Sequence, residues 1–316
     1  MTRSGVLGQP LASVRREVPV PPTDQPRNFT SDSHKLLHNL TTSAEDLASG
    51  PFVVHSDLVH AGRVLEQYPG RVPWLTAHLE VLANASSGRS LWMPTFHYAF
   101  TRTGRFDTLR HPSEVGVLTE RFRTHIADWR TAVPVFSFSG TGVPPAVDDT
   151  GTVDPFDDRS VFAEMVRQDA ILVFFGASFS SSTIKHHVER RTGGPIYRYD
   201  KDFPGAVTLV DGTVRSVVLH YHVRPLTHRL TYDDERLLRE AEDADVVRLA
   251  PASEPYRLIA ASARRLVAFW EDRLDHDPFY FLDEASRSWA EPLMQHLGRR
   301  FELRDFEGPA PIKADT

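Results

Sequence analysis

His186 and Glu189 are the two residues of this sequence whose types and spacing best suit the transfer of a proton. In a helix, residues three positions apart lie on one face, so the imidazole and the carboxylate would be neighbours. Imidazole titrates near neutral pH, and a nearby carboxylate raises its basicity because it favours the charged ring. We therefore predict that this segment is a place where an anionic ligand is bound and a proton is moved. The alternative is a surface helix that carries the same pair without a function.

The segment that must position this pair spans residues 171–205. The apolar run Ile171–Phe175 predicts a buried strand that ends at Gly176, and small residues follow it up to Thr183, where a polar helix is predicted to begin. The first N–H groups of a helix have no partner within it, so such a turn suits an anion. Thr183 is therefore predicted to face the phosphate or other anionic group of a ligand, or else to act only as a cap.

Composition narrows the class of protein. The chain has 316 residues, of which 41% are hydrophobic and 25% charged, with a formal charge of −6, so no nucleic-acid partner is predicted. It has no cysteine, which excludes disulfides, thiolate metal ligands and an acyl-cysteine intermediate. No segment reaches the roughly 18 apolar residues that cross a bilayer, so we predict a cytoplasmic protein with no membrane partner. Residues 1–30 are rich in proline and arginine and are predicted to form an extended or mobile lead.

Short β-prone runs alternate with helical patterns along the rest of the chain, which predicts an α/β protein whose last third, from Tyr232, is mostly helical. The turn Asp211-Gly212 predicts a hairpin. The predicted strands are 51–55, 91–94, 135–139, 171–175, 207–210 and 214–223, and the predicted helices are 73–82, one capped at Ser113, 160–167, 256–274 and 284–297.

Four blocks of the sequence carry a resemblance to a known family through their order and spacing. The blocks are 54–58; 93–96 with 106–107 and 113–116; 122–123 with 134–137; and 183–186 with Glu189, 197–199, Lys201 and Phe203. Together they resemble the antibiotic N-acetyltransferase family, whose namesakes are the aminoglycoside 3-N-acetyltransferases. Within that family the chain is similar to the branch found with sugar and natural-product pathways. The resemblance implies a mixed central sheet flanked by helices, with residues 31–316 forming one acyl-CoA-dependent N-acyltransferase domain.

The resemblance also implies a reaction. An acetyl or other short acyl group would pass from acetyl-CoA to the amine of a small acceptor by direct attack, without a metal. A homodimer is a further expectation. The resemblance implies that His186 is the general base and that Glu189 orients its ring or holds the amine. The residues expected at the site are His186, Glu189 and Thr183 for catalysis; His55, Ser56, Ser182 and Thr183 for acetyl-CoA; and Asp57, Phe96, Tyr98, Arg198 and Lys201 for the acceptor. Asp57 has a second interpretation as a helix cap, and Arg198 and Lys201 as solvated surface.

Departures from the family's pattern bear on the acceptor. The aminoglycoside enzymes commonly carry an acid where this chain has Ser180, and a histidine-containing block where it has Val133-Pro-Val-Phe-Ser137. Fewer acids favour an amino sugar, an amino-sugar nucleotide or a natural-product amine over a polycationic antibiotic. Three alternatives stay open: an aminoglycoside resistance enzyme, a serine hydrolase suggested by Gly176-Ala-Ser178, and a non-catalytic binding relative. Adjacent His186 and His187 diverge by about 100° on a helix, so no metal site is predicted.

Overall fold

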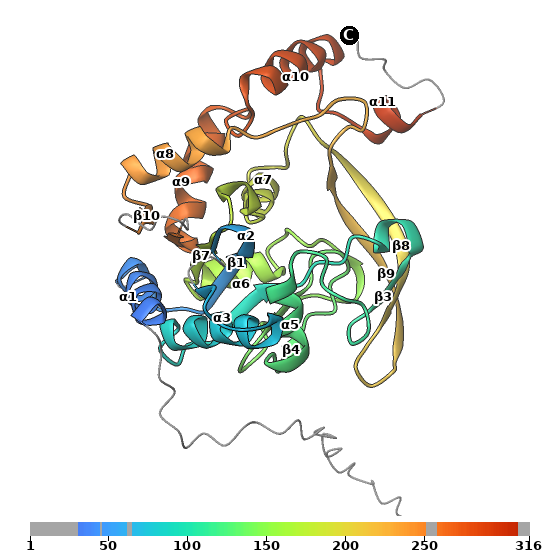
Figure 1. The fold of residues 1–316 in the computed structure, drawn as a ribbon. Helices are drawn as coiled ribbons and strands as arrows, with labels where there is room; N and C mark the ends of the chain where they lie inside the picture. The colour runs from blue at the N-terminus through green and yellow to red at the C-terminus, as the bar shows by residue number, and fades with distance from the viewer. Residues whose placement is uncertain (1–30, 45, 62–64, 251–257, 309–316) are drawn as a thin grey trace, which may run out of the picture.

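The fold consists of two β-sheets with helices around them (Figure 1). The computed structural model describes residues 31–44, 46–61, 65–250 and 258–308, and the predicted N-terminal lead lies outside these residues. Within the described ranges, no helix combines the length and the apolar character needed to cross a membrane.

The helices and strands have the following bounds. The helices are α1 Ser31–Ala44, α2 Leu58–Ala61, α3 Arg71–Ala85, α4 Phe100–Thr103, α5 Val117–His125, α6 Val161–Arg167, α7 Lys185–Arg191, α8 Asp234–Asp243, α9 Ala263–His276, α10 Glu284–Leu297 and α11 Leu303–Glu307, with a 3-10 helix at Phe179–Ser181. The strands are β1 Phe52–Ser56, β2 Leu91–Pro94, β3 Arg105–Asp107, β4 Trp129–Arg130, β5 Phe138–Gly140, β6 Gly151–Val153, β7 Ile171–Phe175, β8 Tyr199–Thr208, β9 Val214–Val223, β10 Val247–Leu249 and β11 Leu258–Ser262.

The larger sheet has the strand order β10-β11-β7-β1-β2-β5-β4 and contains both parallel and antiparallel pairs. All five residues of β7 are buried, as expected for an apolar strand covered on both faces. Parallel pairing of β1 with β7 sets Ser56 opposite Phe175, so the two chains leave the sheet side by side. Gly176 permits this turn, because its φ is 69° and a Cβ atom there would lie 2.4 Å from the carbonyl oxygen of Asp57.

The smaller sheet has the strand order β3-β8-β9-β6 and is dominated by the hairpin of β8 and β9 (Figure 1). The hairpin closes at Asp211-Gly212 as predicted, and its register pairs Thr208 with Val214 and, at the far end, Tyr199 with Val223. The first strand is longer than the predicted run 207–210. In Figure 1, α7 lies between this hairpin and α9, against which it packs.

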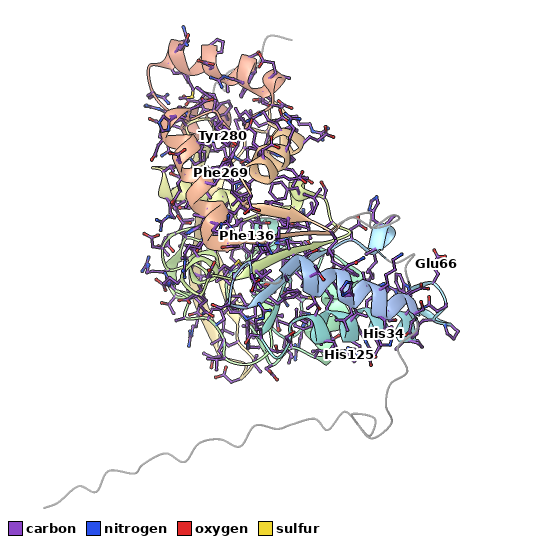
Figure 2. All side chains as sticks on the ribbon, turned by 90° about the vertical axis from the view of Figure 1, so that its left-hand side faces the viewer. His34, Glu66, His125, Phe136, Phe269 and Tyr280 are labelled. Carbon is purple, nitrogen blue, oxygen red and sulfur yellow. The ribbon has the colours of Figure 1, made fainter. Side chains whose placement is uncertain are left out.

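The C-terminal helices cover one end of the molecule. Figure 2 shows Phe269 of α9 and Tyr280 at this end, Phe136 near the middle, and His34 and His125 toward the opposite end. One apolar core runs from the sheets into α9, where Trp270 is fully buried. The predicted α/β class and the mostly helical last third are confirmed, with β10 and β11 as additional strands.

Three predicted boundaries are wrong for local reasons. The strand predicted at 135–139 begins only at Phe138, because Val135 has a φ of 64° and breaks the extended backbone. The helix expected to be capped at Ser113 begins at Val117, after Gly116. The helical pattern predicted at 256–274 contains β11, since a short buried apolar run has the same appearance in a strand and in a helix.

Candidate active site

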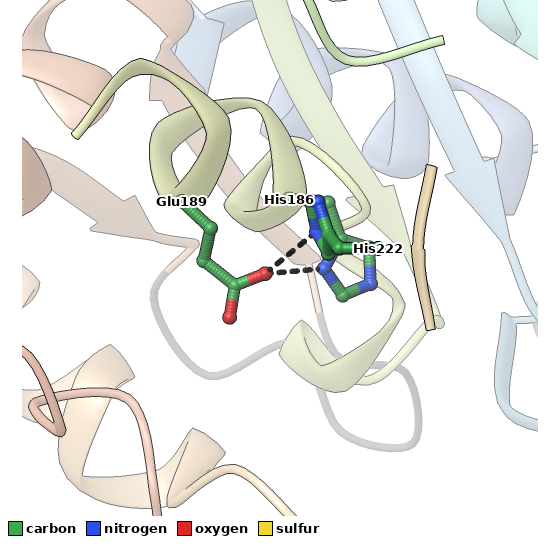
Figure 3. A group of neighbouring side chains, drawn as sticks. All are labelled: His186, Glu189 and His222. Atoms are coloured by element: carbon green, nitrogen blue, oxygen red, sulfur yellow. Dashed lines mark hydrogen bonds and ion pairs between the residues drawn. The ribbon is translucent and has the colours of Figure 1, made fainter. Parts of the chain in front are cut away.

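The candidate site is centred on the carboxylate of Glu189, which is 1% exposed and accepts four hydrogen bonds. Its Oε2 lies 2.7 Å from Nδ1 of His186 and 3.2 Å from Nε2 of His222 (Figure 3). Its Oε1 accepts hydrogen bonds of 2.6 Å from the hydroxyls of Tyr197 and Tyr232. Burial alone would raise the pKa of Glu189, but the hydrogen bonds from His186 and His222 outweigh it and hold the pKa well below its usual range. The carboxylate is therefore ionised at neutral pH.

This arrangement determines which ring nitrogen of His186 carries the proton. Because Glu189 is ionised, it accepts a hydrogen bond from Nδ1–H, which leaves Nε2 as the nitrogen with a free lone pair. Within the described part of the chain, no residue forms a hydrogen bond with this Nε2. Burial lowers the pKa of His186, and the bond to Glu189 partly opposes that effect. The ring is thus neutral at pH 7, and its Nε2 is able to accept a proton.

Three residues that contact Glu189 were not predicted: His222, Tyr197 and Tyr232. His222 lies at the end of β9, is 0% exposed, and has its pKa lowered by burial to about 3, so it donates to Glu189 as a neutral ring. The sequence feature that could have located His222 is the turn of the hairpin. Pairing extended outward from Asp211-Gly212 sets His222 opposite Asp200, beside the predicted site residues Arg198 and Lys201.

Two cations lie behind this network. Arg198 donates a 2.8 Å hydrogen bond to the hydroxyl of Tyr232, whose own proton goes to Glu189. Lys185, at the start of α7, is 2% exposed, forms an ion pair with Asp234, and lies 5.1 Å from the centre of the Tyr232 ring. These contacts hold α7 against the start of α8 and leave Glu189 in a positive environment.

A cavity of about 640 Å³ opens on His186 and His222. The predicted acceptor residues Tyr98, Arg198 and Lys201 line it, as do the aromatic rings of Phe136, Phe156, Phe203 and Tyr221. Lys201, Phe203 and Tyr221 lie on the hairpin and Arg198 directly precedes it, whereas α4 contributes Thr101 and Arg102 to the lining. The structure thus brings the predicted base and three predicted acceptor residues to one cavity.

A second cavity of about 230 Å³ lies at the carboxyl ends of β1 and β7. His55, Ser56 and Thr183, three of the residues predicted for acetyl-CoA, line it together with Phe96, Ser180 and Ser181. Tyr98 lines both cavities. Phe96, which was predicted at the acceptor, is therefore on the side of the predicted acyl-donor residues.

The remaining predicted site residues have local roles. Asp57 lies outside the residues that line either cavity, and its carboxylate accepts hydrogen bonds at the start of α2 from the N–H of Val59 and from His60, which is the capping alternative. Ser182 is 1% exposed and lines neither cavity. The N–H of Thr183 is not free as predicted, because it donates to Ser181 in the turn that precedes α7.

Two alternative chemistries have little support in this geometry. Oγ of Ser178 accepts a hydrogen bond from the N–H of Ser180, and none of the described histidines forms a hydrogen bond with it, so no serine-hydrolase triad is assembled. His186, Glu189 and His222 are residue types that bind metals, with ligand atoms within 4.8 Å of one another. However, Nδ1 of His186 and Nε2 of His222 are directed at the same carboxylate oxygen of Glu189, which is the arrangement of a hydrogen-bonded network (Figure 3).

The family of the chain follows from a comparison with known protein families. The family model described as aminoglycoside 3-N-acetyltransferase matches residues 54–275, more than two thirds of the chain. The chain belongs to this family. The family, the fold and the class of an acetyl-CoA-dependent acyltransferase predicted from the sequence are thereby confirmed. No curated protein sequence matches this family member significantly.

Several solved structures have the same fold at low sequence identity. AAC-IIIb in a binary complex with CoASH is 17% identical, with a TM-score of 0.62 over 77% of this chain and 96% of that one. A variant of aminoglycoside acetyltransferase AAC(3)-IVa in complex with gentamicin is 18% identical, with a TM-score of 0.61 over 84% and 96%. YokD from Bacillus subtilis is 15% identical, with a TM-score of 0.58 over 79% and 95%.

Proposed function

We propose that this protein transfers an acetyl or another short acyl group from acetyl-CoA to the amine of a small acceptor, with His186 as the general base. The observation that supports this role is the hydrogen bond of 2.7 Å from Nδ1–H of His186 to Glu189, which leaves Nε2 available in the larger cavity. An amine can attack a thioester only after it loses its proton, and a neutral imidazole at pH 7 is suited to remove it.

The chemical step then balances as a direct transfer. Nε2 of His186 takes one proton from the ammonium form of the acceptor. The nitrogen then forms a bond to the thioester carbon as the carbon–sulfur bond breaks, and the second proton that the nitrogen loses on becoming an amide goes to solvent. The imidazolium is stabilised by Glu189, whose Oε2 already accepts its Nδ1–H. The proton passes on to the sulfur that leaves. Thr183 is proposed to help position the thioester, because it lines the smaller cavity three residues before the base.

The two cavities are proposed to hold the two substrates. Ligand pockets commonly measure about 300–1,000 Å³, so the smaller cavity, of about 230 Å³, has room for the thioester end of acetyl-CoA but not for its nucleotide. His55 and Ser56 supply polar atoms there. The larger cavity then holds the acceptor, and its aromatic rings provide apolar faces for a sugar or a natural-product ring.

We propose an acceptor with fewer positive charges than an aminoglycoside. Among the described residues that line the larger cavity, Glu307 is the one carboxylate, and it is already bound to Lys201 and to the hydroxyl of Tyr199. A polycationic antibiotic would therefore find no free acid in the cavity. An amino sugar, an amino-sugar nucleotide or a natural-product amine fits this environment better.

The test is to incubate the purified protein with acetyl-CoA, a thiol reagent and a set of amines. Thiol release that depends on a monoamino sugar supports the proposal. Efficient turnover of gentamicin, with resistance on expression, would instead favour an aminoglycoside resistance enzyme. Ester hydrolysis without CoA would favour the serine hydrolase, and no turnover would favour the non-catalytic relative. A homodimer and a cytoplasmic location stay predictions.

A further inference from the structure

The larger cavity carries an excess of positive charge. In the part of the chain that the structure describes, four cationic side chains line it, together with one carboxylate, that of Glu307. The four cations are Arg102, Arg198, Lys201 and Arg224. They come from α4, from the start of the hairpin and from the residue that follows β9, so folding brings them together from distant parts of the sequence.

The partners of these cations differ. Lys201 is bound to Glu307, and Arg198 donates to Tyr232 beside the ionised Glu189. Arg102 and Arg224 are exposed, and neither has an ion-pair partner among the residues that the structure describes. Two free guanidinium groups at the mouth of a cavity favour an anion, because guanidinium binds phosphate and carboxylate through paired N–H groups.

We propose that the acceptor bears, besides its amine, an anionic oxyacid group, either a phosphate or a carboxylate, which Arg102 and Arg224 bind at the mouth of the larger cavity. This inference rests on the proposed function, because it assigns the larger cavity to the acceptor. It also explains why an acceptor with several ammonium groups is disfavoured, since the same cations would repel it.

The alternative is that Arg102 and Arg224 bind the phosphates of acetyl-CoA. Three of the four residues predicted for acetyl-CoA line the smaller cavity, at the ends of β1 and β7. Arg102 and Arg224 line the larger cavity instead, from α4 and from the residue after β9. The two assignments predict different kinetics. An arginine that binds the acceptor changes the KM of one amine and not of another, whereas an arginine that binds acetyl-CoA changes the KM of acetyl-CoA with every amine.

The experiment compares four amines: glucosamine, glucosamine 6-phosphate, 2-amino-2-deoxyglucuronic acid and gentamicin. The second carries a phosphate, the third a carboxylate, and the fourth several ammonium groups. Each is assayed with the wild-type protein, with the double variant Arg102→Gln/Arg224→Gln, and with the control Arg215→Gln. Arg215 lies on β9 outside the lining of the cavity, so this control removes a charge from the same hairpin. Binding of glucosamine 6-phosphate is also measured by calorimetry, which does not require turnover.

We expect kcat/KM to be higher for the phosphate or the carboxylate than for glucosamine, and the double variant to reduce it by about tenfold or more for that acceptor alone. The acceptor with the higher value identifies the anion. Equal loss for every amine, a raised KM for acetyl-CoA, or preference for gentamicin would overturn the inference. If no amine is turned over but the double variant weakens binding of glucosamine 6-phosphate, the anion site stands and the proposed function fails. If that probe does not bind and no anionic amine is preferred, the site is refuted.

Discussion

Replacing Glu189 by glutamine should slow acyl transfer while keeping the shape of the site. The carboxylate accepts four hydrogen bonds, two on each oxygen, whereas glutamine offers one oxygen and one NH2 group. The bond to His186 becomes most valuable when the ring gains a proton, because it then joins two charges. A hydrogen bond to a charged group contributes about 1.5–3 kcal/mol, which corresponds to a loss in kcat of roughly tenfold to 150-fold.

The direction of the pKa change gives a second measurement. Glu189 raises the pKa of His186 against the effect of burial, so its removal should lower that pKa further. Histidine labelled with carbon-13 reports the titration by NMR, and His186→Asn identifies the resonance. The acidic limb of kcat/KM should move to lower pH together with it.

Glu271→Gln is the matched control for this experiment. Glu271 forms an ion pair with Arg191 of α7 from outside the cavity, so the control makes the same chemical change next to the same helix. Thermal melting of both variants separates loss of folded protein from loss of turnover. Turnover of Glu189→Gln within threefold of the control, or an unchanged pKa of His186, would refute this account of the site.

Three further predictions follow from the same network. His186→Ala should lower turnover by about two to four decades, the span of a general base, with the KM for acetyl-CoA close to wild type; comparable changes in both would argue against the assignment. Tyr232→Phe keeps the ring over Lys185 but loses a donor to Glu189, so kcat should fall by about tenfold, and an unchanged kcat would show that Tyr197 suffices. Burial lowers the pKa of His55 to about 4, below the value of about 6.5 in an unfolded chain. The unfolded chain therefore binds the proton more readily, so the free energy of unfolding should fall as the pH drops from 6.5 to 4. The slope for this histidine is up to about 1.4 kcal/mol per pH unit. Denaturant titrations should show that slope reduced in His55→Gln and unchanged in the control His38→Gln, whose side chain is exposed.

Local sequence patterns predicted the part of the site that is continuous in the chain. The strand, the turn at Gly176 and the pair of His186 and Glu189 lie within 19 residues, as the bounds of β7 and α7 confirm. Parallel pairing of β1 and β7 then places Ser56 beside this segment.

The residues that complete the site were not predicted, because they depend on long-range pairing. His222 reaches Glu189 only through the register of a hairpin whose first strand begins at Tyr199, well before the β-prone run that the sequence showed. Tyr232 arrives from the start of the helical C-terminal part. The sequence also left the role of Asp57 open, because a short polar side chain is suited both to binding a substrate and to capping a helix. The hydrogen bond from the N–H of Val59 distinguishes the two in the structure.

The position of the hairpin has a consequence for how such enzymes diverge. The proposed acyl-donor residues stand on the ends of the central sheet, whereas Lys201, Phe203, Tyr221 and Arg224 stand on or beside the hairpin. Mutations in the hairpin can therefore alter the lining of the larger cavity without changing the residues that we propose for acetyl-CoA. His222 limits this freedom, because any insertion that slips the strand by one residue would turn its ring to the opposite face. We expect descendants with new acceptors to differ at the neighbours of His222 and to retain the length of the strand.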